Sequence, residues 1–258
     1  MAAVSAAAFG PWMMPAGKAS LADSAYLAIR NEILRGQIRP GTPLSRRRLA
    51  SELGMSVVPV TDALRRLQGE GLVETRPRAG TRVRVPSQED VRELYELREA
   101  LETQSARLFA ERASSAQRLE LTRLAEHLDV LFARLEASGN DDAFRFAVHS
   151  HHVELHMRIA EHARSGVLRR MIERNHILVL NWHFDVAARR TPLPPGFHLR
   201  LAEALVSGDP ARADAAMRSH VRYGLDEISE HVRALTASEW REHPGRRATA
   251  VRQKPIGG

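Results

Sequence analysis

The 258-residue sequence contains no cysteine, which excludes a disulfide framework and a thiolate metal site. It has no apolar run of about 18 residues, so we expect no membrane-spanning helix. Residues 1–20 are rich in alanine but lack the basic start of a secretory signal, and they predict a disordered leader. These absences favour a cytoplasmic protein that has no membrane partner.

The net charge of +7 is unevenly distributed along the chain. Residues 1–85 hold 13 Lys and Arg against 6 Asp and Glu, whereas residues 86–258 hold 25 of each kind. A basic segment joined to a neutral one predicts a polyanion-binding head and a body with another task. Residues 237–258 are again basic, contain glycine and proline, and predict a disordered tail.

The segment 40–85 has the pattern of two short amphipathic helices followed by a hairpin. Gly54 ends the first helix, and Ser56 can cap the second. The apolar positions recur at helical spacing: Leu49, Ala50 and Leu53, then Val60, Ala63, Leu64 and Leu67. Two β-rich strips follow, at 72–75 and 81–85. With a further helix expected at 21–35, the pattern predicts a winged helix-turn-helix domain over residues 21–86.

The rest of the chain, to residue 236, is predicted to be helical throughout. The expected helices cover 89–112, 115–137, 141–163, 167–188, 197–206 and 210–235, with a proline-rich loop at 189–196. No strand is expected after residue 85. The predicted fold class is therefore mainly α, with the winged helix-turn-helix followed by a bundle of about six helices over 87–236.

Arginines and the start of the second short helix are the candidate DNA-contacting residues. Helix-turn-helix proteins hold phosphates with arginine and read base edges from the second helix, which lies in the major groove. The candidates are Arg46, Arg47, Arg48, Ser56, Val57, Val58, Pro59, Thr61, Arg65 and Arg66, with Arg76, Arg78 and Gly80 at the wing tip. Each arginine alone could equally be a solvated surface charge, but the cluster as a unit favours double-stranded DNA.

Several of the twelve histidines fall on apolar helix faces. His149, His152 and His156 share one face of a predicted helix, while His151 points elsewhere. His152 and His156, four residues apart, could hold one metal ion from a single helix. That spacing is a weak signal by itself, because it often arises by chance.

Three stretches resemble a known family. Residues 38–83, IRPGTPLSRRRLASELGMSVVPVTDALRRLQGEGLVETRPRAGTRV, resemble the DNA-binding domain of GntR-family bacterial transcription regulators. LYELREALE at 94–102 and HLRLAEALVSGDPARADAAMRSHV at 198–221 resemble the first helix and the last two helices of the FCD effector domain found in the FadR-like branch. The resemblance spans about residues 21–235. It implies a homodimer, operator DNA, a small organic acid as effector, and a metal ion.

The resemblance also implies the metal ligands, which would be His152, His156, His198 and His220. The family usually has aspartate where this chain has His152. Four neutral imidazoles would leave the charge of a divalent ion uncompensated, which favours zinc or nickel over magnesium or calcium and gives a carboxylate effector a role as ligand. Two alternatives stay open: His152 does not ligate and the site is degenerate, or His149 takes its place.

The expected effector contacts are Arg98, His149, Asn175 and His176. Arg98 matches an arginine in the first FCD helix and could bind a carboxylate, although an ion pair with Glu102 is an equal alternative. In the head, Arg47 matches a DNA-contacting arginine of the family, whereas Val57 and Thr61 stand where the family often has arginine. Valine and threonine can pack on a thymine methyl but cannot make a bidentate contact with guanine, so we expect a distinct operator.

The predicted function is that of a ligand-responsive transcriptional regulator, with repression the commoner outcome in the family. The alternative is a helical metallohydrolase that uses the histidine cluster. The sequence has neither an H-E-x-x-H motif nor a nucleophile–base constellation, which argues against an enzyme. A constitutive architectural DNA-binding protein would leave the histidine cluster unexplained.

Overall fold

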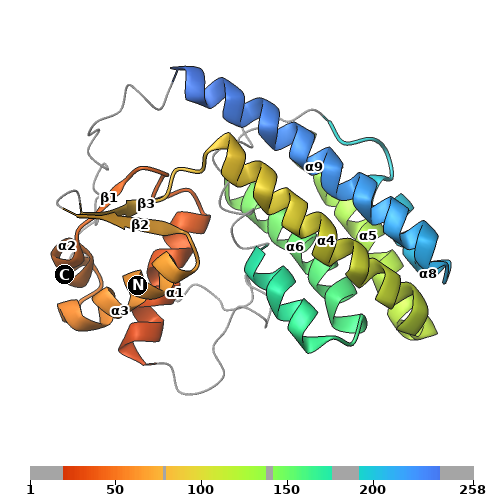
Figure 1. Cartoon of the computed structure of the whole chain (residues 1–258), viewed down its shortest axis with the longest axis horizontal. Helices are drawn as coiled ribbons and strands as arrows, with labels where there is room; N and C mark the ends of the chain where they lie inside the picture. The colour runs from red at the N-terminus through yellow and green to blue at the C-terminus, as the bar shows by residue number, and fades with distance from the viewer. Residues whose placement is uncertain (1–19, 78–79, 138–141, 176–191, 239–258) are drawn as a thin grey trace, which may run out of the picture.

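The computed structural model describes residues 20–77, 80–137, 142–175 and 192–238. Figure 1 shows an N-terminal head, which contains a small sheet, beside a body of long helices. Residues 1–19 of the expected leader, residues 239–258 of the expected tail, Arg78 and His176 lie outside the described residues. None of the described helices is long and apolar enough to cross a membrane.

The head packs three helices against a three-stranded sheet. The helices are α1 (Leu21–Leu34), α2 (Arg46–Glu52) and α3 (Val57–Gly69), and the strands are β1 (Pro43–Leu44), β2 (Val73–Arg76) and β3 (Gly80–Val83). Ser20 and Asp23 form a reciprocal capping box that starts α1. The sheet order is β1-β3-β2, and both pairings are antiparallel. The helix-turn-helix and the wing hairpin follow the sequence pattern, but β1 was not expected because two residues show no alternation.

The head has its own hydrophobic core. Ile29 and Ile33 of α1 meet Val60 and Leu67 of α3, and each of the four side chains is at most 1% exposed. Val83 of β3 closes the cluster from the sheet side. The i, i+3, i+4, i+7 spacing read from the sequence is the face of α3 that is buried here.

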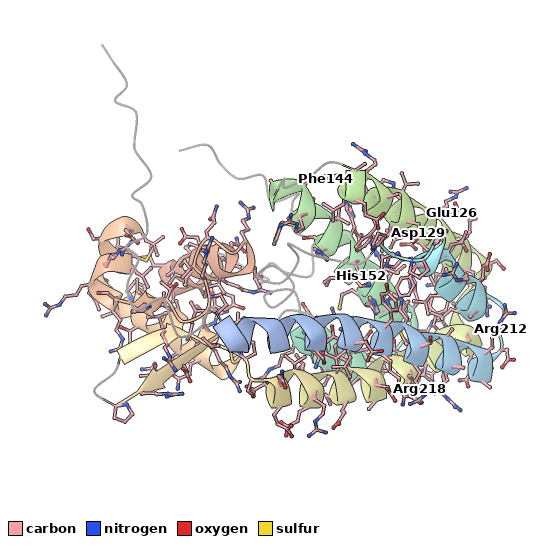
Figure 2. The ribbon with its side chains drawn as sticks, turned by 90° about the horizontal axis from the view of Figure 1, so that it is seen from above. Glu126, Asp129, Phe144, His152, Arg212 and Arg218 are labelled. Carbon is pink, nitrogen blue, oxygen red and sulfur yellow. The ribbon has the colours of Figure 1, made fainter. Side chains whose placement is uncertain are left out.

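Every regular element among the described residues of the body is a helix. Its helices are α4 (Gln88–Arg112), α5 (Ser115–Ala137), α6 (Asp142–His162), a helix described over 166–175, α8 (Phe197–Val206) and α9 (Pro210–Ser238). The first and last run side by side along the body (Figures 1 and 2). A second capping box, Ser87 with Asp90, starts α4. The mainly α fold class predicted from the sequence is confirmed.

Head and body meet where α1 ends. Leu34 is fully buried in a cluster with Phe146, Val153 and Met157 of α6. The guanidinium carbon of Arg35 lies 5.4 Å from the centre of the Phe146 ring. From the helix over 166–175, the Arg174 side chain donates to the backbone oxygen of Gly69, the last residue of α3. Helix α3 is therefore linked directly to the body.

Arg118, near the start of α5, joins the ends of α4 and α8, and its loss should destabilise the fold. Its guanidinium donates to the backbone oxygens of Ala110 at 2.6 Å, Val206 at 2.5 Å and Ala113 at 3.1 Å. Because these oxygens lie at the ends of α4 and α8, the cation also faces the negative ends of two helix dipoles. We expect Arg118→Ala to lower the free energy of unfolding by about 2–3 kcal/mol in urea titrations at fixed protein concentration. Arg118→Lys should lose less, and an unchanged midpoint in the alanine variant would contradict the prediction.

Candidate nucleic-acid interface and metal centre

The start of α3 presents an exposed face made of small and apolar side chains. Val57 is 41% exposed and Val58 is 70% exposed. Ser56 precedes them as the N-cap residue, but its side chain makes no capping hydrogen bond. Thr61, one turn later, donates its hydroxyl to the backbone oxygen of Val57 at 2.9 Å. Pro59 differs from the expectation, because it is buried on the inner side of the helix and cannot reach a ligand outside.

The arginines of the head differ in how they are held. Arg46 and Arg47 are exposed at the start of α2, with no ion pair to any described residue. Arg48 lies 2.7 Å from Glu52, and Arg65 lies 2.9 Å from Asp62; both ion pairs are exposed. Exposed ion pairs contribute little, so these two arginines can exchange their partners for phosphates.

Arg66 has a structural role that the sequence did not show. Its guanidinium lies 2.6 Å from Asp23 and 4.0 Å above the ring of Tyr26, both on α1. Hydrogen bonds from Ser20, together with the one from Arg66, lower the pKa of Asp23 to about 2. Arg66 therefore ties α3 to α1, and its reach toward DNA is restricted.

The wing carries arginines close to its described tip. Arg76 lies 3.3 Å from Glu74, and Arg82 on the neighbouring strand pairs with the same carboxylate. Gly80 has a φ of 82°, a left-handed conformation that other residues adopt only with strain, so the tip requires glycine there. Thr75 and Thr81 form a hydrogen bond across the two strands.

Three of the predicted metal ligands meet inside the body. His152 and His156 come from α6 and His220 comes from α9, and each pair of their Nε2 atoms is 3.1 Å apart. His156 is 2% exposed and His220 is 7% exposed, and Figure 2 labels His152 within the body. Burial and the neighbouring imidazoles hold the pKa of His152 and of His220 well below the usual range. Both rings are therefore neutral near pH 7 and can offer a lone pair to a cation.

The three nitrogens, which we call the histidine triad, fit a transition-metal ion. Metal–nitrogen bonds are about 2.0–2.1 Å long, and a triangle with 3.1 Å sides then gives bond angles of about 95–102°, between octahedral and tetrahedral values. Imidazole donors suit zinc, nickel, copper or iron rather than magnesium or calcium. Among the described residues, this is the group of at least three His, Asp or Glu side chains close enough to share an ion.

A buried carboxylate stands behind one ligand of the triad. Glu102 Oε2 lies 2.5 Å from Nδ1 of His156, and Glu102 Oε1 accepts a hydrogen bond of 2.8 Å from Arg98 Nε. Glu102 and Arg98 are 2% and 4% exposed. A proton held on Nδ1 by the carboxylate leaves Nε2 as the lone-pair donor, which is the tautomer a metal ligand needs. The ion pair weighed as an alternative role for Arg98 is present, and it forms part of the site.

A second carboxylate fixes the fourth predicted ligand, His198. Asp129 Oδ1 lies 2.7 Å from Nδ1 of His198 and also accepts its backbone N–H, while Oδ2 accepts the N–H of Leu199. Burial opposes the ionised form of Asp129, but these hydrogen bonds outweigh it and lower its pKa. The His198 ring lies 5.0 Å from the His152 ring and 5.6 Å from the His220 ring, between centroids. His198 therefore adjoins the triad, and its role as a fourth metal ligand stays a prediction.

Two other predicted effector contacts, His149 and Asn175, are buried in the body. His149 is 1% exposed and packs edge-on against Phe132, 5.7 Å between ring centres. Asn175 is 4% exposed, and among the described residues neither its amide nitrogen nor its amide oxygen has a hydrogen-bond partner. Because Asn175 follows Ile172 by three residues, it lies on the side of its helix that packs against α6.

Comparison with known proteins identifies the chain. The family described as "Bacterial regulatory proteins, gntR family" matches residues 21–83, and the FCD domain matches residues 93–223. The chain belongs to the GntR family. Its members and the relatives below are transcriptional regulators, so the GntR protein is not an enzyme and the metallohydrolase alternative falls.

Relatives and solved structures agree with this GntR assignment. A protein named "Probable D-xylose utilization operon transcriptional repressor", from Paenarthrobacter nicotinovorans, is 31% identical over 74% of this chain and 80% of its own. The repressor RspR of Escherichia coli K12 is 28% identical over 83% of this chain and 91% of its own. The structure of E. coli McbR/YncC superimposes with a TM-score of 0.66 at 20% identity, covering 83% of this chain and 99% of that one. At that identity the likeness shows the fold.

Two carboxylates of this GntR protein's site leave no clear signal in the sequence. The sequence marks Glu102 only by its i+4 spacing from Arg98, and no local pattern marks Asp129. Glu102 and His156 are 54 positions apart, and Asp129 and His198 are 69 positions apart, so neither contact leaves a periodic signal. A buried carboxylate on a helix face that is otherwise apolar is the one hint that the sequence offers.

Proposed function

We propose that this GntR regulator is a repressor that binds double-stranded operator DNA as a homodimer in the cytoplasm. We further propose that a small organic acid, bound at a metal ion in the helical body, changes its affinity for the operator. The observation that carries the proposal is the histidine triad with a carboxylate behind His156, enclosed in the body of a DNA-binding regulator. FCD domains often bind metal ions, and zinc or nickel suits the imidazole donors.

The charges around the triad support a carboxylate effector. The four predicted ligands are neutral imidazoles. Glu102 and Asp129 add two negative charges behind the rings, and Arg98 adds one positive charge. A divalent ion added to these three groups leaves a net charge of one positive unit. One carboxylate group would neutralise it, which favours a monoanionic metal-binding group on the effector.

The residues around the triad give such an effector polar and apolar contacts. The buried amide of Asn175 can donate to and accept from a hydroxyl or carbonyl group. The ring of Phe132, on α5, packs against the rings of both His149 and His152, so the two histidines lie on the same side of α6. We propose that Asn175 and His149 contact the part of the effector that extends away from the metal ion.

The proposal can be tested on the purified full chain. Metal content is measured by mass spectrometry, and operator duplexes are selected from a random pool with the metal-loaded protein. Small carboxylic acids are then screened by thermal shift, since a ligand that binds only the folded state raises the melting temperature. An acid that stabilises the loaded protein but not the chelated one, and that changes operator affinity, supports the proposal. The proposal would be overturned if the protein selects operator duplexes but contains no metal ion, and if no acid changes its melting temperature or its operator affinity.

Removing the charge behind His156 should weaken metal binding. We expect Glu102→Gln to lower zinc affinity by about 10–100-fold, because the ligand loses the carboxylate that fixes its tautomer and raises its basicity. Affinity is measured by competition with a chromophoric chelator. Glu99→Gln is the matched control, since Glu99 lies on the same helix but pairs with Arg218 and Arg222. Equal zinc affinities of the two variants would contradict this role for Glu102.

A further inference from the structure

The start of α3 has an apolar surface, although it lies in the most basic part of the chain. Three large apolar side chains of the head are exposed in the described residues, and two of them, Val57 and Val58, are adjacent at the start of α3. The first turn of this helix carries no acidic side chain. A recognition helix inserts this end into the major groove, so the valines lie where base edges are read.

Few hydrogen-bonding groups lie near the valines. Thr61 donates its hydroxyl proton to the backbone oxygen of Val57, so its methyl group is the part of the side chain that can face a base. Arg65 lies one turn further along and pairs with Asp62. Ser56 keeps a hydroxyl that makes no capping bond. The bidentate donors that read guanine are therefore absent from positions 57, 58 and 61.

The major groove offers one apolar group on its base edges, the C5 methyl of thymine. Val57 and Thr61 are four residues apart, about 6 Å along the helix at 1.5 Å per residue. Successive base pairs are stacked about 3.4 Å apart along the duplex. The apolar face can therefore cover methyl groups on about two consecutive base pairs.

We propose that α3 reads its operator by packing Val57, Val58 and the Thr61 methyl group against thymine methyls, with Ser56 as the polar contact. Each half-site then contains consecutive A·T pairs under the start of α3, where an arginine would have selected guanine. Exposed Arg46 and Arg47 supply phosphate contacts, which hold the helix in place without selecting bases. The inference rests on operator binding by this regulator.

Replacing thymine by deoxyuridine tests the proposal directly, because it removes the methyl group and leaves base pairing unchanged. Duplexes selected from a random pool are resynthesised with deoxyuridine at single half-site positions, and affinity is measured by fluorescence anisotropy at one salt concentration. We expect about a fourfold loss for each methyl that is contacted, the equivalent of burying one methyl group. Val57→Ala/Val58→Ala should bind the thymine and deoxyuridine duplexes with nearly equal affinity, except where the deoxyuridine replaces the thymine that Thr61 contacts.

Two further variants separate this role from a structural one. Thr61→Ser keeps the hydrogen bond to Val57 and removes only the methyl, so it should lose discrimination at one position. Leu21→Ala removes another exposed apolar side chain of the head, 65% exposed, and should keep the full thymine preference. Alanine raises helix propensity at exposed valine positions, so the double variant should stay folded.

The outcomes distinguish a failure of operator binding from a failure of thymine recognition. If no duplex is selected, operator binding itself fails. If duplexes are selected but deoxyuridine has no effect at any half-site position, the reading of thymine methyls is wrong. A loss of affinity with 7-deazaguanine at the positions under α3 would show that guanine is read there instead, and would also overturn the proposal.

Discussion

Replacing His156 with alanine is expected to lower zinc affinity by about 100–1,000-fold. The Nε2 atom of His156 lies 3.1 Å from both other nitrogens of the triad, so its removal leaves two ligands from different helices. Zinc sites with four protein ligands bind with about 10–16 kcal/mol, which assigns about 2.5–4 kcal/mol to each ligand. Competition with a chromophoric chelator measures the change.

The neighbouring His151→Ala variant is the matched control. His151 also lies on α6, but its side chain is 42% exposed and contacts Glu154 at 3.4 Å rather than the triad. We expect it to bind zinc like the parent chain. Equal zinc affinities of the two alanine variants would show that the triad does not hold the ion. Melting curves of the metal-free proteins check that the buried substitution has not unfolded the body.

A second substitution keeps the test decisive if His156→Ala does not fold. His152→Asp introduces the residue that the resemblance places at this position and retains a ligand oxygen. We expect it to bind zinc, with a larger share of binding to harder ions such as manganese, because a carboxylate replaces an imidazole. Loss of all metal binding in this variant would contradict the assignment of His152.

Breaking the contact between head and body is expected to uncouple metal binding from DNA binding. Helix α6 carries His152 and His156, and the residues that follow each of them, Val153 and Met157, pack with Leu34 of α1. Arg174 holds the end of α3 through Gly69. A shift of α6 on metal binding can therefore reach the head directly through Leu34, and the helix that carries Arg174 supplies a second contact.

The expected result concerns the ratio of operator affinities with and without bound zinc. Coupling free energies of about 1–3 kcal/mol change affinity by about 5–150-fold in regulators of this kind. The double variant Phe146→Ala/Arg174→Ala should reduce that ratio toward one while both binding reactions persist. Arg169→Ala, on the same helix as Arg174 but paired with Glu173, should leave the ratio unchanged. An unchanged ratio in the double variant would exclude this contact as the route.

What the sequence predicted well was local. The apolar spacing from Val60 to Leu67 predicted a helix whose ends agree with those of α3 to within a few residues. The same helical periodicity placed His152 and His156 on one face. These features depend on residues within about one to two turns of each other, so a single sequence contains all the information they need.

The tertiary structure decided what the local pattern left open. It buried Pro59, turned Arg66 toward Asp23, and set Glu102 against His156 across two helices. It also brought His220 within 3.1 Å of the α6 pair, which the sequence supported only through resemblance to a family. Such contacts depend on how helices pack and at what register. That packing is set by the whole core at once, and no short stretch of sequence contains it.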